Sequence, residues 1–228
     1  MQKGKLYIIP TPIGNLKDIS ERAKFLLEDV DIIACEDSRK AGLLFERLSL
    51  TKKRFLSYHD HNEIESAKGI VKLILEGNNI GLISDAGYPC ISDPGYRLVN
   101  ESINNKIEII ALPGTSSILP ALVCSGFETN NFTFLGFPPA KKGRQTFIND
   151  VLNRKETVVI FESVHKIEKL LDQINNIDSN RKISISREIS KVHEEVIRGN
   201  AIDCLNYLQN NTIKGEFVIV IERIKNVH

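Results

Sequence analysis

The sequence predicts an α/β protein of two domains, with a parallel sheet in the N-terminal domain and a mixed sheet in the C-terminal domain. In the first half, short apolar runs alternate with stretches of helical period, which is the pattern of crossover units in a parallel sheet. In the second half, only residues 188–191 separate two strand candidates, and so short a connection indicates an antiparallel hairpin. We therefore predict an N-terminal α/β domain over residues 1–114 and a C-terminal α/β domain over residues 115–228.

The N-terminal domain is predicted to contain five strands, because five short runs are apolar enough to be covered on both faces. These runs are residues 6–10, 31–35, 54–58, 79–84 and 107–112. The clearest helix between them covers residues 18–30, where apolar residues repeat on one face. Asp18 and Glu21 have the spacing of a capping box, so we expect this helix to begin at Asp18.

The C-terminal domain is predicted to begin with a helix over residues 116–125. Further strands are predicted where β-branched and aromatic residues gather, with helices between some of them. The strand candidates are residues 132–135, 157–162, 182–187, 192–198 and 216–222. A loop rich in Gly, Pro and Lys, residues 136–143, follows the first of these strands.

The overall charge excludes a general electrostatic attraction to nucleic acid or anionic membrane. Thirty Lys and Arg residues stand against 29 Asp and Glu, a formal net charge of +1, so any such binding would need a local basic patch. Four separated cysteines without a C-x-x-C pair indicate reduced thiols rather than disulfides or zinc ligands. No apolar segment approaches the roughly 20 residues of a membrane span, so we expect a cytoplasmic protein that is not bound to a membrane.

Polar residues and turn formers follow each of the first five predicted strands. In open parallel sheets, ligands bind beyond the carboxyl ends of the strands. Any one such turn is rich in Gly, Pro and Asp in many proteins, but five in succession indicate a binding edge. The turns are residues 10–15, 36–39, 59–63, 85–89 and 113–117.

The first of these turns argues against a phosphate ligand. It contains neither the G-x-G-x-x-G pattern of dinucleotide sites nor the G-x-x-x-x-G-K-[ST] pattern of a P-loop. Pro10 and Pro12 each lack a backbone donor, so this turn offers mainly carbonyl acceptors, which suit a cationic or uncharged small molecule. His59 and His61 flank Asp60, but without a second ligand cluster we favour hydrogen bonding there and predict no metal site.

Motifs along nearly the whole chain resemble the tetrapyrrole methylase superfamily, and within it the branch that methylates RNA of the small ribosomal subunit. In the first half they are P-T-P-I-G-N-L at 10–16, C-E-D-S-R at 35–39, H-D-H-N-E at 59–63, S-D-A-G-Y-P-C-I-S-D-P-G at 84–95 and L-P-G-T-S-S at 112–117. In the second half they are G-F-P-P-A-K-K-G-R at 136–144, F-E-S-V-H-K at 161–166, R-E-I-S-K at 187–191 and K-G-E-F-V-I-V-I-E at 214–222.

This resemblance implies a methyltransferase that uses S-adenosylmethionine, needs no metal and forms a homodimer. It implies 2′-O-methylation of a cytidine ribose in the decoding centre of 16S rRNA, with that RNA, expected within the 30S subunit, as the partner. The sequence leaves open whether the free RNA or the assembled subunit is the substrate. Cofactor contacts are then expected in the first, fourth and fifth turns and in the second domain. The residues carried over are Pro10, Gly14, Asp85, Gly87, Tyr88, Ile91, Ser92, Pro113, Thr115, Ser116, Phe161, Glu162 and Gly215.

Catalysis on a ribose hydroxyl requires a proton acceptor within hydrogen-bond reach. We expect Asp37 or Glu36 to be this base, with Arg39 orienting it or binding phosphate and His61 as a rival base. The alternative is that Glu36, Asp37 and Arg39 form a structural ion-pair network. RNA contacts are expected from three basic residues of the Gly-Pro loop, Lys141, Lys142 and Arg144.

Two other functions remain open from the sequence. One is C-methylation of a tetrapyrrole such as uroporphyrinogen, and the other is RNA binding without catalysis. Two departures from the family pattern bear on the pocket: Tyr88 stands where Thr is commoner, and Thr115-Ser116 replaces a more frequent small pair.

Overall fold

The computed structural model describes residues 3–59, 62–211 and 214–224. The chain divides into two compact units, unit 1 over Met1–Ser116 and unit 2 over Ser117–His228. The expected domain boundary after residue 114 falls close to this division.

Unit 1 is built on a five-stranded parallel sheet of order β3-β2-β4-β1-β5. Each strand lies inside a predicted run, and the central strands are apolar and buried from both sides. The strands are β1 (Leu6–Ile8), β2 (Ile32–Cys35), β3 (Arg54–Ser57), β4 (Ile80–Ile83) and β5 (Ile109–Ala111). The helices are η1 (Leu16–Asp18), α1 (Glu21–Asp29), α2 (Ser38–Arg47), α3 (Glu63–Leu75) and α4 (Tyr96–Asn104).

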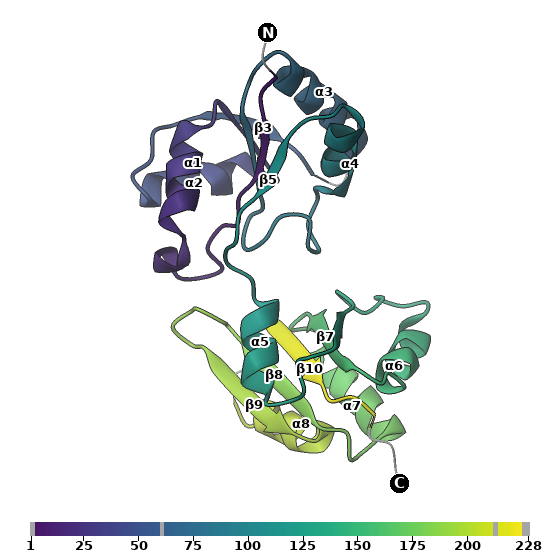
Figure 1. Cartoon of the computed structure of the whole chain (residues 1–228). Coiled ribbons are helices and arrows are strands. Elements are labelled where there is room, and N and C mark those ends of the chain that lie inside the picture. Colours follow the sequence, from purple (N-terminus) through teal and green to yellow (C-terminus); the bar gives the residue numbers. More distant parts are fainter. Residues whose placement is uncertain (1–2, 60–61, 212–213, 225–228) are drawn as a thin grey trace. The chain divides into compact units, whose positions relative to one another are not determined.

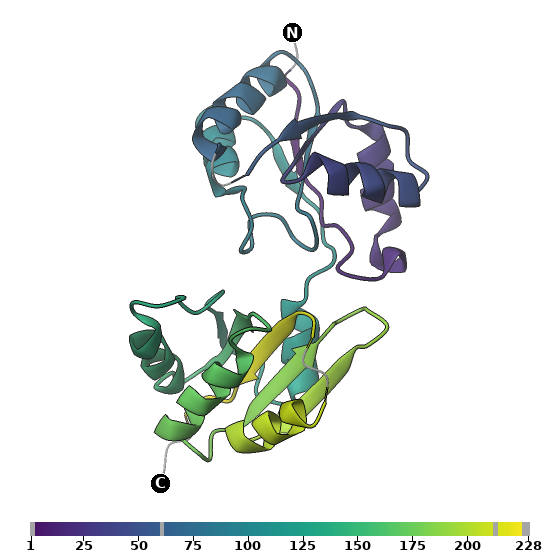
Figure 2. The same ribbon diagram turned by 180° about the vertical axis from the view of Figure 1, so that it is seen from behind.

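Helices cover both faces of this sheet. Figures 1 and 2 show α1 and α2 on one face and α3 and α4 on the other. Each pair buries its own apolar cluster against the sheet: Leu27 and Phe45 lie in one cluster, and Ile74 and Leu98 lie in the other. The sheet is therefore fixed from both sides, and its carboxyl edge carries the turns that the sequence singled out.

The first helix begins later than the sequence indicated. Ser20 is the N-cap of α1, and its hydroxyl accepts the backbone N–H of Ala23. Asp18 instead ends the short 3-10 helix η1. The expected start at Asp18 is wrong because two cap-like residues lie two positions apart, and sequence spacing alone favoured the earlier one.

Unit 2 is built on a mixed sheet of order β6-β7-β10-β8-β9, which confirms the predicted fold class. Only β6 and β7 run parallel, and β8 and β9 form the predicted antiparallel hairpin. The strands are β6 (Phe132–Phe134), β7 (Thr157–Glu162), β8 (Ile183–Arg187), β9 (Glu195–Gly199) and β10 (Phe217–Ile221). The helices are α5 (Ile118–Ser125), α6 (Arg144–Leu152), α7 (Ile167–Ile177) and α8 (Ala201–Gln209).

The helices of unit 2 also lie on two faces of its sheet. Apolar side chains of α6, α7 and α8 form the larger buried cluster, and α5 packs on the opposite face. Within the described ranges, no helix is long and apolar enough to span a membrane.

Candidate functional site

Three of the polar turns of unit 1 are joined through Thr11. Its backbone exchanges two hydrogen bonds of 2.9 Å with Gly87 of the fourth turn. Its hydroxyl donates to the Ser84 carbonyl at 3.1 Å, and its carbonyl accepts the Thr115 hydroxyl of the fifth turn at 2.5 Å. Thr11 is buried, so it acts as the internal tie between turns that carry predicted cofactor residues.

Close backbone packing adds a second connection between the first and fifth turns. A Cβ on Gly114 would lie 2.6 Å from the Pro10 ring, a distance that real side chains do not reach. Glycine is therefore required at this position. The sequence singled out neighbouring residues but missed Thr11 and Gly114 as the pair that brings the turns together, although both lie within the quoted motifs.

The loop of the fourth turn, residues 84–95, has an unusual backbone. Cys90 and Ser92 have positive φ angles of 69° and 63°, a region that costs non-glycine residues about 1–3 kcal/mol each. Ile91 lies between them and is exposed. Such strain persists only where surrounding contacts fix the chain.

Glu63 provides those contacts at the far end of the loop. One carboxylate oxygen, Oε1, accepts the backbone N–H of Gly95 at 3.1 Å and that of Arg97 at 3.3 Å. The same oxygen accepts the Tyr58 hydroxyl at 3.0 Å, and Tyr58 accepts the Leu98 N–H at 3.1 Å. Glu63 and Tyr58 thus cap the first turn of α4, which has no side-chain cap of its own.

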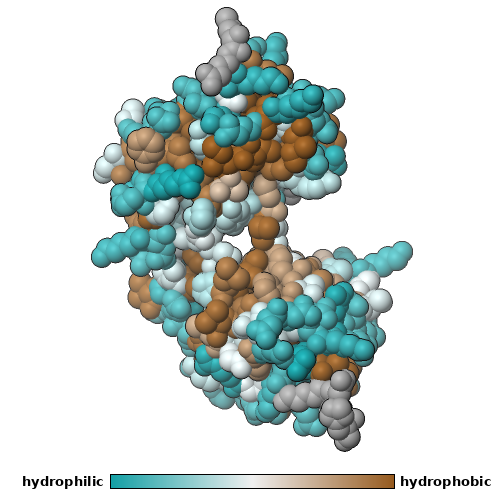
Figure 3. Space-filling model, viewed as in Figure 1, coloured by the Kyte–Doolittle hydropathy of each residue, from teal (hydrophilic) through white to brown (hydrophobic). Residues whose placement is uncertain are grey.

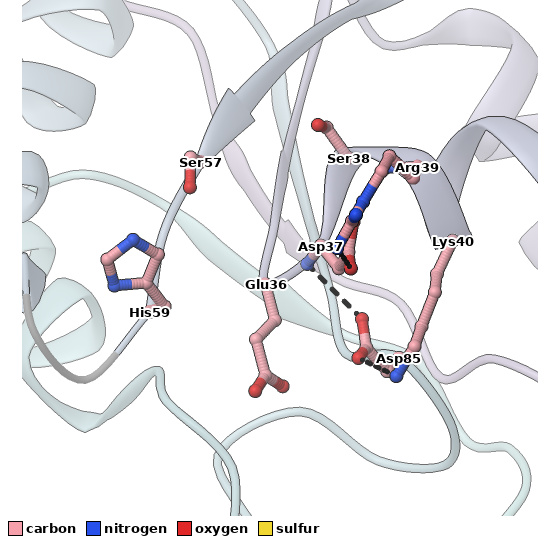
Figure 4. A pocket seen from close by; sticks show the side chains of 8 residues that line it. All are labelled: Glu36, Asp37, Ser38, Arg39, Lys40, Ser57, His59 and Asp85. Atoms are coloured by element: carbon pink, nitrogen blue, oxygen red, sulfur yellow. Dashed lines mark hydrogen bonds and ion pairs between the residues drawn. The ribbon is translucent and has the colours of Figure 1, made fainter.

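The second and third turns line a polar pocket with a volume of about 430 Å³ (Figure 4). It brings together Glu36, Asp37 and Arg39, the predicted catalytic residues, with the predicted cofactor residue Asp85. Its full lining is Glu36, Asp37, Ser38, Arg39, Lys40, Ser57, His59 and Asp85. The rival base His61 lies outside the described residues, as does Asp60.

Within this pocket, the Asp37 carboxylate is engaged on several sides. It caps α2 by accepting the Arg39 backbone N–H at 2.8 Å, and it accepts Nε and Nη2 of the Arg39 guanidinium at 3.1 and 2.8 Å. These hydrogen bonds, first from the Arg39 side chain and then from its backbone, hold the pKa of Asp37 far below its ordinary value. Asp37 is therefore a weak proton acceptor.

Asp85 ties the fourth turn to the start of α2. Its carboxylate accepts the Asp37 backbone N–H at 3.3 Å and the Lys40 ammonium at 2.7 Å. The hydrogen bond and the charge of Asp85 raise the pKa of Lys40. The sequence did not indicate that Lys40 belongs to this site, because its partner Asp85 lies 45 residues away in the chain.

Glu36 occupies a different side of the pocket. Figure 4 shows its side chain extending away from the Asp37–Arg39 pair. Glu36 is half-buried. The thiol of the preceding residue, Cys35, is no competing nucleophile, because burial, followed by the charges of Asp85 and Asp37, raises its pKa to about 12.

Unit 2 holds the remaining predicted site residues. Phe161 packs against Phe134 and Phe137, with ring centroids 4.9 and 5.3 Å apart. Gly215 has a φ of 100°, and a Cβ there would lie 2.5 Å from the Glu188 side chain. Gly215 therefore has a structural reason to be glycine that is independent of any ligand.

Arg144 and Glu162, predicted as RNA and cofactor contacts, bind each other. Their side chains are 4% and 2% exposed, and Nη2 of Arg144 lies 2.5 Å from Oε2 of Glu162. Nε of Arg144 donates to Gln173 at 3.0 Å. The expected RNA contact of Arg144 thus needs correction: its guanidinium lies in the interior of unit 2, whereas Lys141 and Lys142 are exposed.

Among the described residues, no group of three or more His, Cys, Asp or Glu side chains is arranged to hold a metal ion.

Comparison with known proteins identifies the family. Residues 5–203 match the Tetrapyrrole (Corrin/Porphyrin) Methylases. A protein named Ribosomal RNA small subunit methyltransferase I from Hydrogenobaculum sp. is 41% identical over 221 residues, covering 96% of both chains. A protein of the same name from Halalkalibacterium halodurans is 40% identical over 96% of this chain and 76% of its own length.

Solved structures show the same fold at low sequence identity. Diphthine synthase superposes with a TM-score of 0.74 at 12% identity, over 96% of this chain and 90% of that one. Uroporphyrin-III-C-methyltransferase from Thermus thermophilus superposes with a TM-score of 0.67 at 16% identity, over 96% and 94%.

Proposed function

This chain belongs to the tetrapyrrole methylase family, and from that premise we propose that it methylates the ribose 2′-hydroxyl of a cytidine in the decoding centre of 16S rRNA. Its methyl donor is S-adenosylmethionine. The observation that carries the choice of an RNA substrate is the identity of about 40% to relatives named for small-subunit ribosomal RNA. The structures of tetrapyrrole and diphthine enzymes support the fold only, at 12–17% identity.

The turns of unit 1 fit a sulfonium donor better than a phosphate ligand. Pro10 has no N–H, and the N–H groups of Thr11 and Gly87 already bond each other's carbonyls. These three positions therefore leave no backbone donor for an anion, and the fourth turn adds the negative charge of the Asp85 carboxylate, which favours a cation. Residues of these turns that would hold the donor are Pro10, Gly14, Asp85, Gly87, Tyr88, Ile91, Ser92, Pro113, Thr115 and Ser116.

We propose Glu36 as the general base. When bound, S-adenosylmethionine supplies an electrophilic methyl group. The ribose hydroxyl becomes an effective nucleophile only when its proton leaves, and the carboxylate of Glu36 accepts that proton in this proposal. Asp37 is held by Arg39 and by the start of α2, so its role is to position Arg39 and the α2 terminus beside the substrate.

Substrate identity can be tested by offering several acceptors to the purified protein. Labelled S-adenosylmethionine is incubated separately with 30S subunits, free 16S rRNA and uroporphyrinogen. We expect label in 16S rRNA, and mass spectrometry should locate it on one cytidine ribose. Label in uroporphyrinogen alone would assign the chain to tetrapyrrole methylation, and RNA binding without transfer would assign it to a non-catalytic role.

The assignment of the base is tested by two isosteric variants. Glu36→Gln should lower kcat by about 10²–10⁴-fold, the usual contribution of a general base. Asp37→Asn should lower it by less than about tenfold, because asparagine is as good an N-cap as aspartate. Binding of S-adenosylmethionine, measured by calorimetry, should be the same for both variants and the wild type. A large loss in Asp37→Asn with none in Glu36→Gln would reverse the assignment.

The family resemblance also leads us to propose a cytoplasmic homodimer. Light scattering on the purified protein measures the oligomeric state, and a monomer at working concentration would contradict it.

A further inference from the structure

An exposed aromatic side chain and two exposed lysines belong to the same loop of unit 2. Phe137 follows β6 in the loop that leads to α6, and its side chain is 57% exposed. Lys141 and Lys142 are exposed in the same loop. Between them and Phe137, Pro138 is buried and fixes the path of the chain.

The ring of Phe137 rests on a fixed support. Its centroid lies 5.3 Å from that of Phe161, and Phe161 in turn packs edge-on against Phe134 at 4.9 Å. The backbone N–H of Phe161 donates to the Gly136 carbonyl at 2.9 Å, which holds the residue before Phe137 on strand β7. Phe137 is therefore placed by its neighbours on one side while much of its ring stays in solvent.

The buried ion pair anchors the other end of this loop. Nη1 of Arg144 reaches the Pro139 carbonyl at 3.5 Å, while Nη2 is bound to Glu162 and Nε to Gln173. Arg144 immediately follows the two lysines and Gly143 in the chain. The Arg144–Glu162 pair thus holds the loop between Phe137 and the two lysines against the interior of unit 2. This contact explains why a buried arginine follows two exposed lysines in the sequence.

Exposure alone does not mark a site on this molecule. Figure 3 shows hydrophobic residues at the surface of both units, and Phe25 and Val192 are 66% and 95% exposed. What distinguishes Phe137 is the combination of a supported ring and two exposed lysines in the same loop. Proteins recognise single-stranded RNA with this combination, because bases stack on aromatic rings while cations follow the phosphates.

We propose that Phe137 is a stacking platform for an unpaired base of the RNA substrate, with Lys141 and Lys142 contacting the adjoining phosphates. The inference rests on the RNA-methyltransferase function proposed above and adds a requirement to it. The substrate must present an unstacked base at this loop, so single strands and loops bind better than duplex RNA. The near-zero net charge of the protein does not prevent RNA binding in this proposal, because the affinity for RNA comes from Phe137, Lys141 and Lys142.

The test measures binding of a fluorescent single-stranded RNA and of a duplex with the same sequence. Phe137→Ala should weaken binding of the single strand by about tenfold, the usual effect of removing one stacking partner, and leave the duplex unaffected. Phe137→Leu, which keeps apolar bulk without an aromatic face, should lose as much, and Phe137→Trp should restore binding. The variant Phe25→Ala, at a similarly exposed phenylalanine of α1, serves as the matched control.

Salt dependence separates the ring from the lysines. Replacing Lys141 and Lys142 by Ala should reduce the slope of log affinity against log salt by about one per lysine, whereas Phe137→Ala should leave the slope unchanged. Affinity for S-adenosylmethionine should not change in any of these variants.

Three results would contradict the proposal. Equal binding of the single strand by Phe137→Ala and the wild type overturns it, and so does full binding by Phe137→Leu. Loss of S-adenosylmethionine affinity in Phe137→Ala would place the ring against the methyl donor instead of RNA. If the wild type itself neither binds nor methylates RNA, the proposed function fails rather than this inference.

Discussion

Gly95 lies where the strained loop of residues 84–95 meets α4, and a side chain does not fit there. Its φ is 153°, and an added Cβ would lie 2.2 Å from Sγ of Cys90. Gly95→Ala should therefore lower the free energy of unfolding by about 2 kcal/mol, a typical cost of overpacking and backbone strain. Urea unfolding followed by circular dichroism measures this loss.

Gly69 provides the matched control for this substitution. It lies in the middle of α3, and a Cβ added there would meet open space. Gly69→Ala should raise stability by about 0.5–1 kcal/mol, because alanine favours the helix. Equal effects of the two substitutions would show that the contact with Cys90 does not constrain the loop.

The surroundings of some single residues could be predicted from the sequence, and those of others could not. Glu36, Asp37 and Arg39 could be placed in one pocket because they directly follow a strand of a parallel sheet, and that edge is predictable. The partners of Arg144 and Glu162 could not be predicted. These residues lie 18 positions apart in two separate motifs, and only the packing of α6 beside β7 shows that each satisfies the other.

At the scale of elements, the Arg144–Glu162 pair joins the first turn of α6 to the end of β7. Because both side chains are buried, Arg144→Met should lower the free energy of unfolding by about 3–5 kcal/mol, since it leaves a buried carboxylate without its partner. The double variant Arg144→Met, Glu162→Leu should recover much of this loss. Chemical unfolding of the three proteins gives the comparison.

An exposed pair in the same unit is the control. Arg223 and Glu128 are bridged at 2.8 Å with side chains 50% and 45% exposed. Arg223→Met should cost less than about 1 kcal/mol, because solvent screens an exposed ion pair. A similar cost for Arg144→Met would mean that Glu162 finds another partner or water, and that the loop of Lys141 and Lys142 does not depend on the pair.

The helices and strands themselves were largely predictable from periodicity, but their ends were not. The run at residues 107–112 yields β5 over only Ile109–Ala111, and α1 begins after Ser20 rather than Asp18. Periodicity reports which residues are buried, whereas an end depends on which local hydrogen bond forms.

At the scale of the whole molecule, the two sheet types followed from connection lengths. Crossover helices separate the strands of unit 1, while only residues 188–194 separate β8 from β9. Hydrogen bonds between residues far apart in the sequence also stabilise each unit, and connection lengths do not predict them. Thr11 bonds Thr115 across 104 residues, and Glu63 caps a helix that begins 33 residues later.

Both units contain partly buried carboxylates whose charge stabilises the fold. Burial raises the pKa of Glu63, but the N–H groups of Gly95 and Arg97, the Tyr58 hydroxyl and the charge of Arg97 outweigh it, so the pKa is lowered from 4.5. In unit 2, burial is likewise outweighed at Glu188 by Lys191 and the Glu216 N–H, and its pKa is lowered too. A lowered pKa in the folded state means that protonation favours unfolding.

The pH dependence of stability follows with a definite sign. The contribution of Glu63 is fully present above its unfolded pKa of about 4.3 and is lost as pH falls through the lower folded value. Glu63→Gln should therefore be less stable than the wild type at pH 7, and the two should converge as the pH falls through the lowered pKa of Glu63 in the folded state. Urea unfolding across this range measures the gap. A gap that stays constant with pH would show that the cap of α4 depends on the shape of the Glu63 side chain and not on its charge.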